Sequence, residues 1–191
     1  MNPISLNIRN RRSTKPEEFN GDTISNDLIL HLLENAIWAP THGRTEPWQF
    51  YVYSGVSLRI LGNQLASAYK SGVEESMIDV HQLQKYQERP GLASHIIGVV
   101  MIRGENVKIP AHEELLACAC AVQNILLTAT STNIASYWST GPLINTESFK
   151  NNFNLRSEDH FLGLIYLGKI NDSITKEGKR NHTSSDKTIF F

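Results

Sequence analysis

The sequence predicts an α+β fold, an α/β sandwich in which long helices pack around one modest sheet. Two observations support this prediction. The chain has 191 residues, 40% of them hydrophobic, which suits one domain (residues 1–191) with a substantial core. Segments with helical periodicity also alternate with short apolar runs typical of strands. The expected order is helix, helix, strand, helix, helix, strand, helix, strand, helix, strand.

The first half of the chain supplies five of these elements. Residues 5–12 predict a short helix that ends in a basic cluster. Ser25 is a typical N-cap for an apolar-faced helix that Pro40 closes. Apolar and polar residues alternate over 48–53 and predict a strand. Two helices are expected next, over 58–69 and within the more polar stretch 71–89, which we expect at the surface.

The second half supplies the other five. The apolar run 96–102 predicts a fully buried strand. Residues 115–132 predict a helix that is apolar nearly all round, so we expect it at the centre and against a partner subunit, with Asn133 as its left-handed cap. A strand (134–138), a short helix (145–152) and a last strand (161–167) follow. The tail, 169–191, ends in three apolar residues, so we expect it to pack on the partner.

Composition argues against several functional classes. A net charge of -1 disfavours a dedicated nucleic-acid binder. No continuous apolar run approaches the roughly 18 residues that span a bilayer, and no signal peptide is evident. Cys118 and Cys120 are too few for a disulfide framework, and the histidines show no metal-ligand spacing. We therefore expect a cytoplasmic protein without a metal.

Four places in the sequence could carry chemistry. The run from Arg11 to Lys15 suits a phosphate group, although a solvated basic face is the simpler alternative. The Pro- and Gly-stiffened loop from Trp38 to Trp48, which contains His42, could hold a ligand or only connect two elements. Residues 138–141 could line a planar ligand or form an ordinary strand exit. Arg180, by itself, is typical of a surface arginine.

Taken together and in this order, these segments resemble the nitroreductase family of FMN-dependent oxidoreductases, in particular its compact bacterial branch. The residues that carry the resemblance are Arg11-Arg12-Ser13-Thr14-Lys15, Ala39-Pro40 through Pro47-Trp48-Gln49-Phe50, the long apolar helix, Trp138-Ser139-Thr140-Gly141 and the strand from Gly163 to Gly168. The similarity covers essentially the whole chain. It implies a mostly antiparallel central sheet flanked by helices, and a homodimer with FMN at the subunit interface.

The resemblance also implies roles for single residues. Arg11 and Ser13 would contact the flavin phosphate and ribityl chain with Arg12 close by, and Lys15 would lie near the N1–C2=O edge of the ring. Trp38 and His42 would reach the same flavin from the other subunit. The remaining cofactor contacts implied are Trp138, Ser139, Thr140 and Gly141 beside the ring and Arg180 near the phosphate. No catalytic side chain is expected, because the chemistry occurs at FMN N5.

The activity that the resemblance implies is a ping-pong transfer of hydride from NADH or NADPH, through FMN, to a nitroaromatic, a quinone or a similar small acceptor. Two alternatives stay open. The same fold serves dehydrogenases, dehalogenases and flavin-fragmenting enzymes, and a flavin-binding protein without turnover is the other possibility. The sequence departs from the usual family residues at Trp38, Arg44, Glu46 and Ser139, positions that bear on the choice of electron donor.

Overall fold

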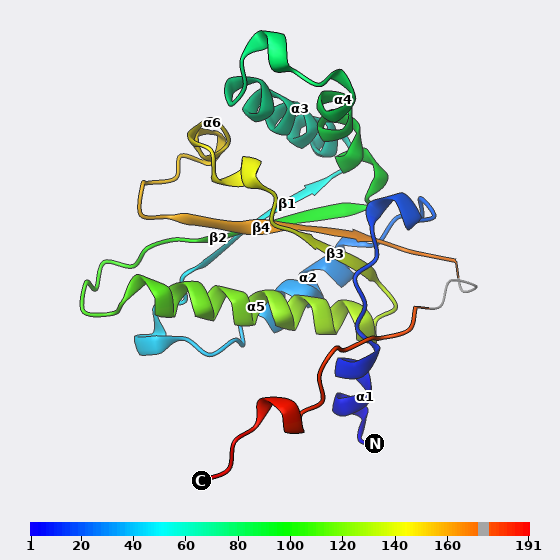
Figure 1. Cartoon of the computed structure of the whole chain (residues 1–191), viewed down its shortest axis with the longest axis vertical. Helices are drawn as coiled ribbons and strands as arrows, with labels where there is room; N and C mark the ends of the chain where they lie inside the picture. Colours follow the sequence, from blue (N-terminus) through cyan, green and yellow to red (C-terminus); the bar gives the residue numbers. More distant parts are fainter. Residues whose placement is uncertain (172–175) are drawn as a thin grey trace.

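The computed structural model describes residues 1–171 and 176–191. Four strands form one sheet with helices on both faces (Figure 1). The sheet order is β1 (Trp48–Ser54), β2 (His95–Met101), β4 (His160–Gly168) and β3 (Ala135–Ser139), and every neighbouring pair is antiparallel. The predicted α+β sandwich with an antiparallel sheet is therefore confirmed.

The helices come in the predicted order, with some boundaries shifted. They are α1 (Pro3–Asn10), α2 (Asn26–Ala36), α3 (Val56–Ser71), α4 (Val80–Glu88), α5 (Ala111–Ser131) and α6 (Glu147–Lys150). In the polar stretch 71–89, a 3₁₀ turn (Glu75–Met77) precedes α4, and Asp79 accepts two backbone N–H groups as the N-cap of α4. The helix expected over 145–152 is one α-turn flanked by 3₁₀ turns.

Local capping chemistry sets two of the helix ends as predicted. The Ser25 side chain accepts a hydrogen bond from the backbone N–H of Leu28, which satisfies one free donor at the start of α2. Asn133 follows the end of α5 with a φ of 56°, the left-handed conformation that asparagine tolerates better than most residues. These two caps fix where α2 begins and where the chain turns from α5 into β3.

The sheet separates two hydrophobic cores. All seven residues of β2 are buried, and their side chains alternate between the two faces. On one face Ile97 and Val99 pack with α2 and α5, and on the other Ile96 and Val100 pack with α3 and α6. Figure 1 shows the same layers, with α5 and α2 below the sheet and α3, α4 and α6 above it.

Helix α5 is central, as predicted, but it is also long and apolar enough to span a bilayer, which the search for a continuous apolar run did not indicate. By length and composition this helix could cross a membrane, with a mean hydropathy of 1.3 over its best window, half of which is buried inside the protein. The continuous-run criterion missed it because uncharged threonine, serine, asparagine and glutamine interrupt the apolar residues. Its buried face packs on the sheet, as in the core helix of a globular domain. Cys118 is buried and Cys120 exposed, so the two thiols lie on different sides of α5.

Candidate functional site

An extended segment, residues 11–15, runs along the outer edge of β3. Ser13 forms a parallel bridge with Ser136, and the backbone N–H of Thr14 donates to the Ser136 carbonyl oxygen at 2.9 Å. Thr14 is buried, whereas Ser13 and Lys15 are exposed. Because side chains alternate along an extended chain, Arg11, Ser13 and Lys15 share the side opposite Thr14.

These three side chains form a cationic cradle, the name used below for Arg11, Ser13 and Lys15. Within residues 1–171 and 176–191, none of their side chains has a hydrogen-bond or ion-pair partner. On one side of the extended segment, the Arg11 guanidinium offers a planar pair of N–H donors, the Lys15 ammonium a compact positive charge, and the Ser13 hydroxyl a further hydrogen-bond donor. Such a set can bind a phosphate or another oxyanion.

Arg12, the fourth basic candidate, has a different environment. Its guanidinium donates to the carbonyl oxygens of Arg9 at 2.5 Å, Arg11 at 2.8 Å and Lys176 at 3.0 Å. Gly178 lies so close that a Cβ atom there would be 2.3 Å from Arg12 Nη2. Arg12 thus holds part of the C-terminal tail against the N-terminal segment.

The tail brings a second lysine to the cradle. Lys176 Nζ donates to the Ser13 carbonyl oxygen at 3.2 Å and pairs with the Glu18 carboxylate at 2.7 Å. The hydrogen bond from Lys176 holds the pKa of Glu18 below its usual value. Arg180 is exposed, and its guanidinium donates to the Lys179 carbonyl oxygen, with no hydrogen bond to Arg11, Ser13 or Lys15 among the described residues. No local sequence pattern predicts that Lys176 lies beside the cradle, because its partners Ser13 and Glu18 lie near the other end of the chain.

Trp138 and Ser139 end β3 against an irregular part of β4. The register of β4 shifts near Gly163, where φ is 148°. Trp138 Nε1 donates to the Leu162 carbonyl oxygen at 3.2 Å. A Cβ atom at Gly163 would lie 2.3 Å from Trp138 Nε1 and 2.7 Å from the Ser139 carbonyl oxygen. Only glycine therefore lets β3 approach this closely, as is typical of a bulge near a functional site.

Ser139 and Gly141 open into a small pocket of about 210 Å³, called the β3 pocket below. Thr140 is exposed beside it. Helix α4 supplies one wall, so part of the polar stretch 71–89 lines the same pocket as Ser139 and Gly141. The lining residues are Leu65, Gln82, Lys85, Tyr86, Arg89, Ser139, Gly141, Leu143, Ile144, Leu164 and Tyr166.

Arg89, which the sequence interpretation missed, links the β3 pocket to the segment that follows Lys15. Its guanidinium carbon lies 5.1 Å from the ring centre of Tyr137 and 5.4 Å from that of Tyr166. Arg89 Nε also donates to Glu17 Oε1 at 2.8 Å, and this hydrogen bond lowers the pKa of Glu17. Stacking and ion pairing together fix the guanidinium.

The loop that carries Trp38 and His42 lies elsewhere. Trp38 follows the end of α2 and is 79% exposed. His42 begins a 3₁₀ turn, and its imidazole pairs with the carboxylate of Glu113 at the start of α5. Arg44 and Glu46 both have positive φ values, so the loop is tightly wound.

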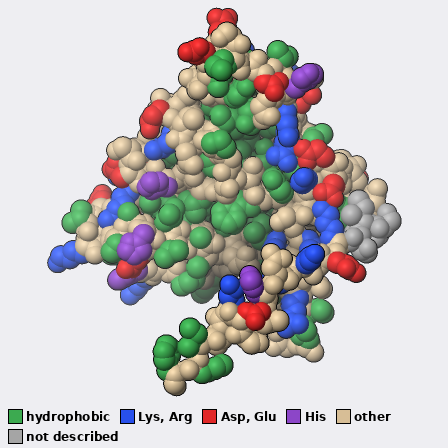
Figure 2. Space-filling view, in the orientation of Figure 1, with side chains coloured by type: hydrophobic (Ala, Val, Ile, Leu, Met, Phe, Trp, Pro, Cys, Tyr) green, Lys and Arg blue, Asp and Glu red, His purple; other side chains and the backbone are tan. Residues whose placement is uncertain are grey.

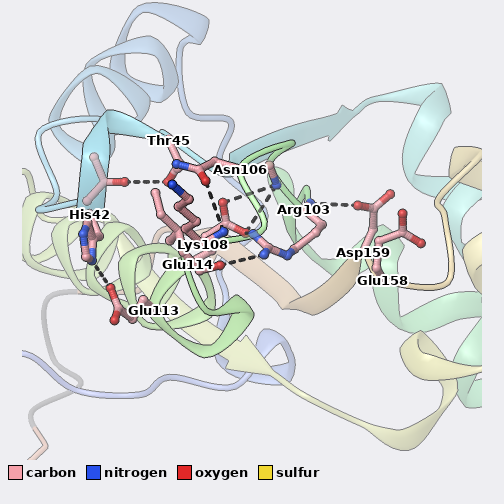
Figure 3. Close-up of polar contacts among 12 residues, drawn as sticks. His42, Thr45, Arg103, Asn106, Lys108, Glu113, Glu114, Glu158 and Asp159 are labelled. Carbon is pink, nitrogen blue, oxygen red and sulfur yellow. Dashed lines mark hydrogen bonds and ion pairs between the residues drawn. The ribbon is translucent and has the colours of Figure 1, made fainter.

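Buried ion pairs anchor this end of α5, as Figure 3 shows. Arg103 Nη1 donates to Glu114 Oε2 at 2.6 Å, and the backbone N–H of Arg103 donates to Asp159 Oδ1 at 2.8 Å. Asp159 also pairs with Arg156, which lowers the pKa of Asp159 despite its burial. The network fixes the loop between β2 and α5, and hence the position of Glu113 beside His42.

The cradle and the His42 loop lie at opposite ends of α5 (Figure 1). Asn7 of α1, just before the cradle, donates to the Leu127 carbonyl oxygen near the end of α5, whereas His42 contacts Glu113 in its first turn. A helix of 21 residues is about 31 Å long. One chain therefore does not bring all the predicted site residues together.

A hollow of about 1320 Å³ contains none of these predicted residues. It is an open cleft between the starts of α2 and α3. His95 lies at its base, 2% exposed, with one ring nitrogen 2.9 Å from Ser94 Oγ and the other 3.1 Å from Asn26 Oδ1. Burial lowers the pKa of His95. Because its polar atoms are satisfied within the protein, we assign this group to structure rather than to the site.

Several known proteins are similar to this chain in sequence or in fold. A protein of Haemophilus influenzae named "Putative NAD(P)H nitroreductase" is 29% identical over 143 residues, which cover 74% of this chain and 76% of that protein. The crystal structure of a nitroreductase-like family protein from Bacillus cereus has a TM-score of 0.87 at 23% identity, covering 100% of this chain and 97% of the other.

A nitroreductase with bound FMN from Bacteroides fragilis has a TM-score of 0.71 at 21% identity, with both chains covered completely. At these identities the two structural matches establish the fold. The model of the family described as "Nitroreductase family" matches residues 8–169, a range that includes the cradle, the His42 loop and β4. The chain therefore belongs to the nitroreductase family.

Proposed function

We propose that this protein is an FMN-dependent oxidoreductase that takes electrons from NADH or NADPH and passes them to a small acceptor such as a nitroaromatic or a quinone. The cationic cradle carries this proposal. The name of the Haemophilus relative and the FMN in the Bacteroides structure support it. Arg12 and Lys176 form hydrogen bonds or ion pairs within the protein, whereas the side chains of the cradle form none with the described residues and can bind a ligand.

The residues present fit FMN. Arg11 and Ser13 would bind its phosphate through charge-assisted hydrogen bonds. Lys15, on the same side of the segment, would place a positive charge near the ring and favour the reduced, anionic form. Ser139, Thr140 and Gly141 would provide polar contacts at the mouth of the β3 pocket, with Trp138 beside them. When bound, FMN supplies reversible hydride chemistry, while the chain supplies binding, orientation and exclusion of water.

We also propose that the working unit is a homodimer with FMN at the interface. The separation of the His42 loop from the cradle along α5 supports this, since a second copy could bring its own Trp38 and His42 to the cradle. Leu116 on α5 is 61% exposed, and Phe190 in the tail is 92% exposed. Figure 2 shows hydrophobic side chains over α5 and at the end of the tail. Packing the tail beyond Lys176 on the partner would cover them.

The cradle is tested by FMN titration of refolded or cofactor-stripped protein, followed by flavin fluorescence. Ser13→Ala and Arg11→Gln should each weaken FMN binding by about tenfold or more, the usual effect of losing a hydrogen bond to a charged group. Arg9→Gln, at the exposed end of α1, is the charge-matched control and should bind like wild type. Unchanged affinity in both cradle variants would refute the assignment.

The dimer is tested by mixing variants of reduced activity. Lys15→Ala and His42→Ala each damage a different half of the proposed shared site. Mixed subunits should recover activity, because each heterodimer contains one intact site and one site with both changes. A monomer by light scattering that still holds FMN would contradict the shared site.

A further inference from the structure

The His42 side chain has one ring nitrogen bound and one free. Its Nδ1 contacts a carboxylate oxygen of Glu113, in the first turn of α5 (Figure 3). An ionised carboxylate can only accept a hydrogen bond, so the hydrogen of this contact belongs to Nδ1. Among the described residues, Nε2 has no hydrogen-bond partner, and 60% of the side chain is exposed. The ring therefore presents Nε2 to any group that binds at this surface.

The Glu113 carboxylate contacts His42 alone. Within residues 1–171 and 176–191 it has no other hydrogen-bond or ion-pair partner. The first turn of a helix favours a negative charge, because its backbone N–H groups have no acceptors within the helix. The start of α5 thus stabilises the ionised carboxylate that the contact requires and fixes its position.

The backbone of the His42 loop is held without help from Glu113. Thr41 Oγ1 lies 3.1 Å from Thr45 Oγ1, and the backbone N–H of Thr45 donates to the His42 carbonyl oxygen at 3.3 Å. Gly43, at a φ of 59°, packs so closely that a Cβ atom there would lie 2.8 Å from Ile109 Cδ1. With the backbone fixed in this way, the contact to α5 sets the orientation of the imidazole itself.

One buried arginine connects the loop to the start of α5. Arg103 Nη2 donates to the Ile109 carbonyl oxygen at 2.6 Å, and Nη1 donates to Glu114 Oε2 at 2.6 Å. Ile109 is the residue against which the loop packs, and Glu114 is the neighbour of Glu113 on the helix. Because both are bound to one guanidinium, His42 and its carboxylate partner are carried by a single rigid unit.

We infer that Glu113 is a positioning residue, which keeps a proton on His42 Nδ1 and turns Nε2 outward to contact the flavin bound by a partner subunit. An imidazole without this contact would populate both tautomers and would lose more side-chain freedom on binding. The inference rests on the proposed function, which has FMN at a subunit interface. It adds that the histidine must be held, and that the carboxylate acts through the ring rather than on the flavin.

The affinity for FMN tests this role, measured by flavin fluorescence as the holoprotein is diluted. Glu113→Ala should weaken FMN binding about two- to tenfold, the usual effect of one lost hydrogen bond. Glu113→Gln keeps an acceptor oxygen at the same place and should retain most of the affinity. Asp27→Ala is the matched control, since it removes an exposed carboxylate from the first turn of α2. It should hold FMN like wild type.

A double variant separates positioning from a merely structural role. If Glu113 acts only through His42, adding Glu113→Ala to His42→Ala should leave the FMN affinity of the single variant unchanged. Mixed subunits should show the same grouping. Glu113→Ala mixed with Lys15→Ala should recover activity, because each heterodimer has one intact site. Mixed with His42→Ala it should not, because both changes damage the same half of the site.

Nuclear magnetic resonance of the ring nitrogens reports the position of the proton directly. At about pH 8, where an ordinary histidine is neutral, Nδ1 of His42 should carry a proton in the wild type and in Glu113→Gln. Glu113→Ala should show a mixture of tautomers. The signal is identified by its loss in His42→Ala. A role for Glu113 in holding the helix alone would not move this signal.

The outcomes separate this inference from the proposed function. Unchanged FMN affinity in Glu113→Ala, an unchanged tautomer, or a loss that persists in full beside His42→Ala would each overturn the inference. Neither affinity nor tautomer depends on turnover. A bound flavin that neither NADH nor NADPH reduces would contradict the proposed electron transfer, while these two readouts would still decide the role of Glu113.

Discussion

Replacing Gly163 by alanine is the sharpest structural test of the site. The new Cβ would lie 2.7 Å from the Ser139 carbonyl oxygen and 2.3 Å from Trp138 Nε1. The indole could rotate away, but the backbone carbonyl could not without moving the end of β3. The φ of 148° is also a conformation that alanine rarely adopts.

These two effects set the magnitude. Backbone strain of this kind costs about 1–3 kcal/mol and overpacking typically about 1–3 kcal/mol, so together we expect a loss of about 2–6 kcal/mol. In a chain of this size that corresponds to a fall in Tm of roughly 4–24 °C. Because Ser139 moves, FMN affinity should fall as well.

The assay is thermal and denaturant unfolding of both proteins at one protein concentration, since an oligomer's stability depends on concentration. Gly91→Ala is the control: a Cβ there meets nothing within 4 Å, and we expect a change within about 0.5 kcal/mol. If Gly163→Ala were as stable as the control and bound FMN normally, the close approach of β3 and β4 would not constrain the site.

Three further predictions follow from named groups. Lys15→Ala should lower the flavin reduction potential and slow reduction by NAD(P)H, measured by anaerobic dye titration and stopped flow; an unchanged potential would remove this role from Lys15. Glu114→Ala should cost about 3–5 kcal/mol in denaturant unfolding, because Arg103 would keep a largely buried charge without its partner, and a loss below 1 kcal/mol would contradict the buried pair. The folded protein disfavours protonated His95, whose pKa burial lowers, so stability should fall as pH drops below about 6.5, by at most about 1.4 kcal/mol per pH unit. His95→Gln should lack this component above the range where carboxylates titrate, and an identical pH profile would show that His95 does not contribute.

Much of the fold could be predicted because it depends on local patterns. The alternation over 48–53, the apolar run 96–102 and the caps at Ser25 and Asn133 are short-range signals, and the structure has each of them. Helix ends were predicted less well where propensity is weak, as in α6. The search for a continuous apolar run did not detect that α5 is apolar enough to span a bilayer, because a buried helix can accommodate the uncharged polar side chains that interrupt such a run.

The candidate site was predictable only in part. The cradle could be predicted because its residues lie within five positions of one another. Arg89, Lys176 and Gly163 reach the site through long-range contacts that no local pattern encodes: ring stacking on two strands, a tail ion pair, and a register shift in β4. Arg12 is the opposite case: its sequence motif suggested a phosphate contact, whereas its guanidinium donates to the Lys176 carbonyl oxygen in the tail.

The central claim is that this chain holds a flavin that a nicotinamide cofactor reduces. The most direct measurement is the visible spectrum of the purified protein, recorded without oxygen before and after NADH and NADPH are added separately. We predict the absorption bands of an oxidised flavin, roughly at 370 and 450 nm for such a cofactor, and bleaching by at least one donor. Colourless protein that takes up no added FMN, or a bound flavin that neither donor bleaches, would contradict the claim.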